Sequence, residues 1–594
     1  MIMNLRSTAL GILLATASHF ASASSGPAPL HLYPLSLRAD AASYDETVAV
    51  ATVQGILNRE APTVYVLAAD PATVGSSASR PNYWLKLLTK PGEWLEGRPQ
   101  TTITNLDALV ALAGNRLKGA VIWDPAVPAT INVATTIAGV RDAIVLSPEL
   151  AQARLAHWGL PVIEDLRGRF TGKETGSAKN DAYRWALREY LAKGLCSAHF
   201  LCLFHDTYTA RASGTIGYAI TRDWAVKNRA FVMDLSPWGD EVPQDDLNQP
   251  LGTDLATYRM ILEETLRQSG GRHMTELAGF FEFEKYTNHN GKHASKHEPV
   301  PTEWETVHLI SPYNVYQNTV ADSCYNQSLH SHAPRSPLTQ GRAAKPRKIE
   351  AKTYLCIFMA DYDSATVTYD TLPRVWDDPN RGRLPLAWGI NPNLLDTFPD
   401  VVAHFYRTLT PADTITADAG AAGYINPSRI TPEHMPLFVR HNQRYFREAD
   451  LDLAPMVLDW KSPSPAVKDA FMQFSPAGMG SMVWDMHTNQ GDPVAPHVWK
   501  GMPVLRLLNE ANEFPGPEKT ADIIANSIAE NGNEKPGFYM YRIVWQNPTA
   551  IIEMLDHLRR KQPQLDIEVL DIHTFYALAK QKLEADRKSH PAAP

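Results

Sequence analysis

Eight short runs rich in β-branched and aromatic residues alternate with helical segments between residues 349 and 582 of this chain. The runs cover residues 354–360, 384–390, 414–417, 454–458, 482–484, 503–508, 538–545 and 567–570. Such alternation is typical of parallel strands joined by helices, because each crossover needs a helix to return the chain to the same edge of the sheet. Eight units of this kind close a (β/α)8 barrel. The sequence therefore predicts an α/β protein whose C-terminal half is a (β/α)8-type barrel.

Two of the helices in this half carry clear start signals. Thr431 precedes Pro432 ahead of the helical segment 433–448, and Asn547 precedes Pro548 ahead of the segment 549–560. A Thr or Asn at the N-cap satisfies a free backbone N–H, and Pro at the first helical position loses no hydrogen bond there. Both helices are expected to begin at these residues.

The N-terminal half shows a similar alternation, so we expect it to be α/β as well. Short β-type runs at 31–37, 63–67, 120–123 and 143–146 accompany a helical segment at 44–58. A second block contains a helical segment at 181–193 and extended runs at 230–235, 277–283 and 306–310. The pattern favours open sheets covered by helices.

A segment rich in proline, lysine and arginine separates the two halves. Residues 330–348 read HSHAPRSPLTQGRAAKPRK and contain too few apolar side chains to form a core. We therefore divide the chain into a first α/β domain at 24–170, a second at 171–332, a linker at 333–348, a barrel at 349–582 and a disordered tail at 583–594.

The first residues are typical of a secretory signal peptide. Arg6 is followed by an apolar run at 9–17 and then by Ala21-Ser22-Ala23, a small-residue cleavage pattern. Residues 1–23 are predicted to be removed after Ala23, which predicts a secreted or periplasmic protein. No apolar run in the chain reaches the roughly 18–20 residues that a membrane-spanning helix needs, so no membrane span is expected.

Charge and cysteine content limit the partners. The net charge is −8, charged residues make up 20% of the chain and no long basic run occurs, which argues against nucleic-acid binding. Cys196 and Cys202 could form a disulfide in an oxidising compartment or remain buried thiols. The sequence leaves the oligomeric state open.

Acidic and aromatic residues follow the predicted barrel strands, where an active site of such a barrel lies. In strand order they are Asp361 and Asp363, Trp388 and Asn391, Asp418, Asp459 and Trp460, Asp485 and His487, Asn509 and Glu510, Arg542 and Trp545, and Asp571 and His573. A carboxylate buried without a partner would cost several kcal/mol, so these side chains are expected to line an open cup. Sugar rings commonly bind against flat aromatic side chains, and the chain has 14 Trp and 22 Tyr.

This set of residues favours a glycoside hydrolase acting on a carbohydrate. Glycosidic cleavage needs one carboxylic acid to protonate the leaving oxygen and one carboxylate as nucleophile or water-activating base. The candidate catalytic residues are Asp361, Asp363, Asp418, Asp485 and Glu510, with Asp363 preferred. The candidate substrate-binding residues are Trp388, Asn391, Tyr424, Trp460, His487, Arg542 and Trp545.

Two other functions fit the same residues. A glycan-binding protein without catalytic activity would use the aromatic cup and lack a suitably spaced pair of carboxylates. A polysaccharide lyase would need a base near an arginine, for which Tyr424, His487 and Arg542 are available.

Metal chemistry is not expected, and no cofactor is required. His289, His293 and His297 are spaced by four residues, but the stretch is rich in Gly and Lys and is a poor helix. Asp361 and Asp363 are similar to the paired aspartates of polysaccharide deacetylases, but those enzymes need a His-x-x-x-His pair that the barrel half lacks. A Ca²⁺ or Mg²⁺ ion could still be held by the acidic cup.

The segment 420–427, Gly-Ala-Ala-Gly-Tyr-Ile-Asn-Pro, resembles the signature of the GxGYxYP family of bacterial glycoside hydrolases. The resemblance extends over roughly residues 30–580, including the blocks 52–62 and 222–246. It implies N-terminal α/β domains, a C-terminal barrel and glycoside hydrolysis. The chain departs from the signature at Ala421, which replaces the first Gly, and at Asn426, which replaces the second Tyr. In the block after the first barrel strand, 361–364, the aspartates match and the flanking residues differ.

Overall fold

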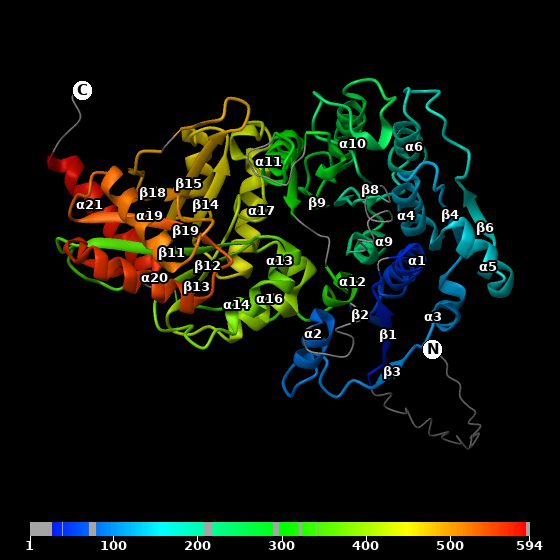
Figure 1. Cartoon of the computed structure of the whole chain (residues 1–594), viewed down its shortest axis with the longest axis horizontal. Helices are drawn as coiled ribbons and strands as arrows, with labels where there is room; N and C mark the ends of the chain where they lie inside the picture. Colours follow the sequence, from blue (N-terminus) through cyan, green and yellow to red (C-terminus); the bar gives the residue numbers. More distant parts are fainter. Residues whose placement is uncertain are drawn as a thin grey trace, which may run out of the picture.

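The chain forms two α/β halves that pack against each other (Figure 1). The computed structural model describes residues 27–38, 40–69, 79–206, 217–288, 296–319, 324–341, 344–492 and 494–589. The predicted signal peptide, residues 1–23, lies outside this described part. No helix in the described ranges is long and apolar enough to cross a membrane.

The N-terminal half contains three small parallel sheets. The first has the order β2-β1-β3, and the second β5-β4-β6. Their strands are β1 (Leu30–Ser36), β2 (Val64–Ala69), β3 (Gln100–Thr102), β4 (Gly119–Ile122), β5 (Ala143–Leu146) and β6 (Val162–Asp165). Helix α1 (Ala41–Leu57) packs on β5 and is buried over most of its length. The remaining helices here are α2 (Arg80–Leu88), α3 (Leu106–Ala113), α4 (Thr130–Arg141) and α5 (Pro148–Trp158).

The third sheet has the order β10-β9-β7-β8 and lies nearest to the C-terminal half. Its strands are β7 (Phe200–Leu203), β8 (Phe231–Met233), β9 (Thr275–Gly279) and β10 (Val315–Asn318). Its helices include α6 (Ala178–Ala186), α9 (Arg222–Asn228), α10 (Thr253–Ser269), α11 (Pro299–Ile310) and α12 (Gln327–His330).

One predicted strand of this region is wrong. Residues 306–310 form the last turn of α11 instead of an extended run. Trp304 and Val307, three residues apart, are both buried in the same core cluster. This spacing places two apolar side chains on one helical face, and over five residues it cannot be told from a short strand.

The C-terminal half is a curled parallel sheet with the strand order β13-β12-β11-β19-β18-β15-β14. The strands are β11 (Thr353–Tyr362), β12 (Leu386–Ile390), β13 (Asp413–Thr416), β14 (Leu453–Asp459), β15 (Gly478–Asp485), β18 (Met502–Leu508), β19 (Gly537–Val544) and β20 (Ile567–Val569). All eight runs predicted from the sequence are strands. Short strands β16 (Gln490–Gly491) and β17 (His497–Trp499) pair antiparallel with β15 and β18.

The eight strands do not form the predicted closed (β/α)8 barrel. Strand β20 pairs with residues 353–355 of β11, and β12 pairs with residues 358–362 of the same strand. Because β20 and β12 pair with different parts of the same strand, β11, β20 does not become the eighth strand of a closed barrel. In the described part of the chain β13 and β14 share no ladder, and one hydrogen bond from the Gly420 N–H to the Met456 carbonyl crosses that gap.

The predicted helix starts are partly confirmed. Asn547 caps α20 (Pro548–Lys561), because its side chain accepts a hydrogen bond from the Ala550 N–H. Helix α17 (Met435–Glu448) begins later than Thr431, because residues 431–434 form a separate turn closed by the His434 N–H on the Thr431 carbonyl. Other helices of this half are α13 (Ala365–Asp370), α14 (Leu372–Trp376), α15 (Leu394–Thr397), α16 (Pro399–Arg407), α18 (Pro465–Phe471), α19 (Pro517–Glu530) and α21 (Ile572–Ser589).

The segment predicted as a linker lies on the C-terminal sheet. The Gln340 side chain bonds both backbone groups of Ile415 in the edge strand β13, at 2.8 Å each. Gln340 therefore protects an open sheet edge, which would otherwise present free backbone groups. At the other end, α21 continues to Ser589 through part of the predicted tail, with ion pairs such as Lys582–Asp586 along its surface.

The two halves share a hydrophobic core. Trp84 of α2 is fully buried, donates its indole N–H to the Tyr369 carbonyl and packs on Phe405. All four cysteines are buried and none belongs to a disulfide, so Cys196 and Cys202 are buried thiols. The halves are therefore joined by packing without a covalent crosslink among these residues.

Candidate active site

The end of β11 carries Asp361 and holds it from two sides. The Arg542 guanidinium on β19 donates to Asp361 Oδ1 at 2.5 Å and to Asn509 Oδ1 at 2.8 Å. The Trp545 indole N–H donates to the Asp361 carbonyl at 3.0 Å. Asp361 has a φ of 65°, a backbone conformation that a non-glycine residue adopts at a cost. Arg542 therefore holds the Asp361 carboxylate, Asn509 orients Arg542, and Trp545 holds the Asp361 backbone in its strained conformation.

Asp363 and Asp418 lie beneath this carboxylate. Asp363 is 8% exposed and Asp418 is fully buried, with Asp418 Oδ2 accepting the Tyr362 N–H at 3.1 Å. A side chain at Gly389 would not fit, because its Cβ would lie 2.5 Å from Asp418 Oδ2. Glycine in β12 is therefore required for Asp418 to reach the end of β11.

Asn391 supports the acidic residues from below and uses both ends of its side chain to do so. Its Oδ1 accepts the Asp418 N–H at 2.8 Å, and its Nδ2 donates to the Ala419 carbonyl at 2.9 Å. The predicted role as a substrate contact does not fit these bonds. Asn391 positions the loop that carries Asp418.

A fourth carboxyl, missed by the sequence reading, comes from the N-terminal half. Glu303 of α11 lies close enough to Asp361 and Asp363 that their charges act on it. Glu303 does not follow a predicted strand, and residues 306–310 of α11 have the pattern of a short strand. The sequence does show two glutamates, Glu303 and Glu305, among the apolar residues of this segment, and the three-residue spacing of Trp304 and Val307 is compatible with a helix.

Four carboxyl groups of the cluster lie near one cation, Arg542, and three of them have raised pKa values. Burial, and then the charge of Asp361, raises the pKa of Asp363 to about 7. Burial and the neighbouring aspartates raise the pKa of Asp418 well above its usual range, and burial does the same for Glu303. Arg542 opposes each of these shifts by favouring the charged form. At neutral pH the cluster therefore holds protonated carboxyls beside the ion pair of Asp361 and Arg542.

Tyr424 of the Gly-x-Gly-Tyr-like segment reaches the same cluster. Burial, then the charges of Glu303 and Asp363, raise the pKa of its hydroxyl well above the usual value, so it stays protonated. Its backbone pairs with Gln317 of β10 at 2.8 and 3.0 Å, which ties the two halves together. Gly423 has a φ of 95°, and a Cβ there would lie 2.1 Å from the Tyr316 ring. The glycine is thus needed for both its backbone and its packing.

A cavity of about 220 Å³ lies at the ends of β14 and β15. Its lining residues are His308, Ser428, Arg429, Trp460, Lys461, Asp485 and His487. Trp460 stacks on His308 at 4.0 Å between ring centres and meets the edge of His487 at 4.5 Å. The Asp459 carboxylate accepts the N–H groups of Ser428 and Trp460, both at 2.7 Å, and so fixes two walls of the cavity.

The structure divides the predicted site residues into three groups. Asp361, Asp363, Asp418, Tyr424, Arg542 and Trp545 come together in the acidic cluster, whereas Trp460, Asp485 and His487 line the neighbouring cavity. Asn391 supports the loop that carries Asp418, and the two remaining predicted residues belong to neither place. Glu510 is exposed beside Arg506, 3.9 Å away.

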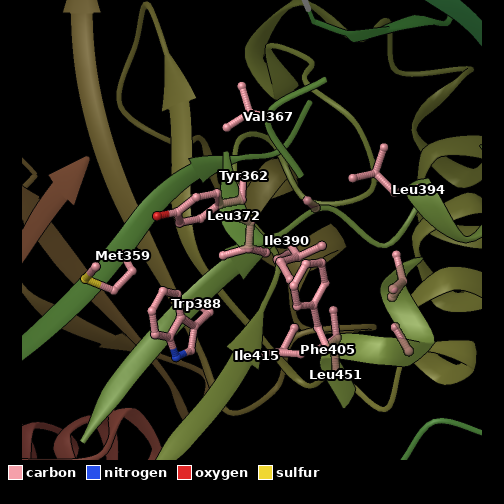
Figure 2. Packing of buried hydrophobic residues seen from close by; sticks show 14 of the residues in the cluster. Met359, Tyr362, Val367, Leu372, Trp388, Ile390, Leu394, Phe405, Ile415 and Leu451 are labelled. Carbon is pink, nitrogen blue, oxygen red and sulfur yellow. The ribbon is translucent and has the colours of Figure 1, made fainter. Parts of the chain in front are cut away.

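Trp388 is the second residue outside the site. It is fully buried, packs on Trp376 and Tyr362, and donates its indole N–H to Asp413 at 2.9 Å. Figure 2 shows Trp388 among core residues such as Met359 and Ile390. Its strand position was correct, but its ring points into the layer between sheet and helices and presents no face to a ligand.

The histidines considered for zinc give no metal site in the described residues. His297 is buried and contacts Asn288 Oδ1 and Asp240 Oδ1, while His289 and His293 lie outside the described residues. Over the described ranges no group of three or more His, Cys, Asp or Glu side chains is arranged to hold a metal ion.

Family models match both the C-terminal half, which carries the acidic cluster, and part of the N-terminal half. Residues 351–580 match the "GxGYxYP putative glycoside hydrolase C-terminal domain", and residues 117–195 match the "GxGYxYP_N second domain". The chain belongs to the GxGYxYP family. No curated protein matches the sequence.

Solved structures extend the likeness of this GxGYxYP protein to nearly its whole length. The crystal structure of a "putative hydrolase" from Bacteroides thetaiotaomicron is 18% identical, covers 94% of this chain and 95% of its own, and has a TM-score of 0.69. At this identity the likeness shows the fold alone. A "putative polysaccharide deacetylase" from Mycobacterium smegmatis is 11% identical and covers 42% of this chain and 96% of its own. Its TM-score of 0.29 is too low to carry an argument.

The family signature explains one strained residue. Ala421 takes the place of the first signature Gly and has a φ of 108°, in a region that L side chains rarely adopt. Asn426, in place of the second Tyr, is fully buried and bonds to the Leu458 carbonyl at 3.2 Å. The first departure leaves strain in the loop, and the second gives the buried position a structural bond.

Proposed function

We propose that this protein is a glycoside hydrolase that cleaves glycosidic bonds in a poly- or oligosaccharide. The observation that carries the proposal is the contrast within one cluster. Asp361 is ion-paired with Arg542, whereas Asp363, two residues later, has a pKa raised to about 7. A pair of carboxyls with different protonation states is what acid/base cleavage of an acetal requires. The description of the matching family supports the same reaction class.

Asp363 is the proposed general acid. Its proton passes to the glycosidic oxygen as the bond from that oxygen to the anomeric carbon breaks. Asp361 is the proposed charged partner, acting as the nucleophile or as the base that takes a proton from the attacking water. Water then supplies the new hydroxyl on the sugar, and the proton lost from water restores the carboxyl.

Glu303 and Asp418 have supporting roles in this proposal. Glu303 approaches the cluster from α11 and stays protonated, so it can donate a hydrogen bond to a substrate oxygen. Asp418 has no exposed surface and receives the Tyr362 N–H, so it is a positioning residue for the end of β11.

The alternative of a polysaccharide lyase fits the arrangement less well. Its base would have to be Tyr424 or His487, and the raised pKa of Tyr424 keeps that hydroxyl protonated. His487 lies in the neighbouring cavity, bonded to Glu305 at 3.1 Å, and not beside Arg542. A silent glycan-binding protein differs from a hydrolase only in lacking turnover, which the following experiment measures.

The test is the Asp363→Asn variant assayed on a broad oligosaccharide panel for released reducing ends. Because Asn keeps the shape and cannot donate the proton, turnover should fall about 10²- to 10⁴-fold while binding changes little. The matched control is Glu530→Gln, an exposed carboxyl at the end of α19, which leads into the start of β19 and therefore lies at the opposite end of the strands from the cluster. An Asp363→Asn enzyme with full activity removes Asp363 from the mechanism. A wild-type protein that binds sugars and releases no reducing ends would support the glycan-binding alternative.

We also propose that the protein acts outside the cytoplasm, because the leader pattern ending at Ala23 and a polysaccharide substrate agree. N-terminal sequencing of protein isolated from its native cells should begin near Ser24. Retention of Met1 would contradict this.

A further inference from the structure

The cavity beside Trp460 carries more positive than negative charge. Arg429 and Lys461 both line it and are exposed. Within the described part of the chain neither side chain forms an ion pair. Two cations in one cavity therefore remain available to a ligand.

The remaining ionisable groups of the cavity do not cancel this charge. His487 is bonded to Glu305, and the Asp485 carboxylate accepts the N–H groups of His487 and Thr488. Burial and the charge of Arg429 lower the pKa of His308 to about 4, so the ring is neutral at neutral pH. Asp485 is then the one unpaired anion among the lining residues, against two cations.

Two buried ring nitrogens of the cavity also lack hydrogen-bond partners in the described structure. Trp460 is 5% exposed, and its indole N–H has no acceptor. Nδ1 of His308, whose ring stacks on Trp460, is likewise without a partner. A buried N–H without an acceptor costs about 1–3 kcal/mol, which a bound oxygen would recover. The cavity thus combines two cations with the unpartnered indole N–H of Trp460.

The cavity adjoins the acidic cluster instead of forming a separate surface. Helix α11 supplies Glu303 to the cluster and His308 to the cavity. The charges of Asp363 in the cluster and of Asp459, which bonds to Ser428 and Trp460 of the cavity, both raise the pKa of Tyr424. A ligand extending along α11 can therefore occupy both places.

We infer that this cavity, formed by Arg429, Lys461, Trp460 and His308, is a subsite for a sugar unit carrying an anionic substituent. The substituent is a uronate carboxylate or a sulfate ester, and both present oxygens to the two cations. At about 220 Å³ the cavity is smaller than the roughly 300–1,000 Å³ of pockets for drug-sized ligands, so it holds one sugar unit of a longer chain. The inference rests on the proposed carbohydrate substrate and names its class.

The test compares charged and neutral sugars of equal length by calorimetric titration of the full-length protein. The ligands are an oligoglucuronide, a neutral gluco-oligosaccharide and the neutral chain bearing one sulfate. Wild type should bind one or both anionic ligands at least tenfold more tightly than the neutral one, and raised salt should reduce the difference. The stronger of the two anionic ligands identifies the substituent.

The variant that removes both charges is Arg429→Gln with Lys461→Gln. It should lose the preference for the anionic ligand and keep the affinity for the neutral one. The matched control, Arg440→Gln with Lys519→Gln, removes the same charges from exposed sites on α17 and α19. Trp460→Phe keeps the stacking on His308, removes the indole N–H and should weaken binding of the anionic ligand several-fold.

Three results would overturn the inference. They are equal binding of charged and neutral sugars, no binding of any of the three, and loss of the preference in the control variant. This experiment measures binding and not turnover, so it tests the subsite separately from the proposed hydrolysis. A wild-type protein that prefers anionic sugars and cleaves none of them keeps the subsite and refutes the hydrolase.

Discussion

Two buried groups of charged residues, one in each half, differ in how their charges are matched. In the N-terminal half Lys285 is fully buried and contacts Asp206 at 2.9 Å, Asp234 at 2.8 Å and Asp245 at 3.1 Å. Lys179 adds a second buried cation between Asp245 and Asp254, at 3.0 and 2.8 Å. Every one of these carboxylates has a cation at bonding distance.

The acidic cluster of the C-terminal half has four carboxyls and one guanidinium. Arg542 bonds to Asp361, while Asp363, Asp418 and Glu303 keep raised pKa values. A matched network stabilises a fold only while all its members are present, whereas unmatched buried carboxyls cost stability and are typical of sites that handle protons. Burial also raises the pKa of Asp234 in the first group, to about 6, so the distinguishing feature is that every carboxylate there contacts a lysine; this favours a structural role for the first group and a chemical role for the second.

The largest expected effect is on the matched group. Lys285→Met removes the shared cation of three buried aspartates and should lower the free energy of unfolding by about 3–5 kcal/mol. Urea denaturation measures it. Lys500→Met, which breaks a pair at the surface, is the control and should change stability far less. Equal losses of unfolding free energy in the two variants would show that the buried Lys285 contributes no more to stability than the exposed Lys500.

The next effect should have the opposite sign in the unmatched group. The pKa of Asp363 is raised from 3.8 to about 7, so the folded protein keeps a proton that the unfolded chain releases, and stability falls as the pH rises between these values. Asp363→Asn abolishes that loss and should be more stable than wild type at pH 8 by about 1–3 kcal/mol, at about 1.4 kcal/mol per pKa unit before relaxation. At pH 3.5 the difference should vanish.

Asp245 of the matched group provides the contrast for this pH dependence. Although burial opposes it, Lys179 and Lys285 lower the pKa of Asp245 to about 2, so its stabilisation is present above pH 3.8 and is lost as the pH falls towards 2. Asp245→Asn should therefore destabilise the protein at pH 8. Thermal unfolding of both variants across this pH range would refute the distinction if their shifts had the same sign.

The smallest effect concerns the backbone beneath the acidic cluster. Ala421→Gly relieves a positive φ that costs about 1–3 kcal/mol in a residue with a side chain, and it gives back part of this through a freer unfolded chain and a lost methyl contact. A net gain of about 1 kcal/mol is expected from urea denaturation. Ala422→Gly is the matched control, because no positive φ marks that neighbour, and it should destabilise. Destabilisation of both variants alike would mean that the strain at Ala421 is negligible.

Local pattern was enough to find the strands and most of the acids. The eight β-type runs of the C-terminal half are all strands, because each run alternates with helix and ends in a polar or glycine-rich turn. Asp361, Asp363, Asp418 and Arg542 lie at the ends of predicted strands, and parallel strands end at one edge, whereas Tyr424 belongs to the segment that resembles the family signature. Their meeting in one cluster follows from that rule and from the family resemblance.

The closure of the sheet could not be obtained in this way. β20 could have formed the eighth strand of a barrel or could share β11 with β12. The outcome depends on pairing between residues more than 200 positions apart, which a short stretch of sequence does not contain. The same holds for Trp388. The sequence places it on a strand, but it does not show which helices cover its side chain. Its ring meets Trp376, which lies on a helix whose packing the sequence does not state.

The sequence by itself determined the type and order of most elements and the carboxyls at the strand ends. Only the tertiary structure brought Glu303 from the N-terminal half against Asp363, left Arg542 as the one cation among four carboxyls, and placed Arg429 and Lys461 around Trp460. The physical reason is that residue type and periodicity act over a few neighbours, whereas the pKa of a carboxyl depends on burial and charges contributed by distant segments.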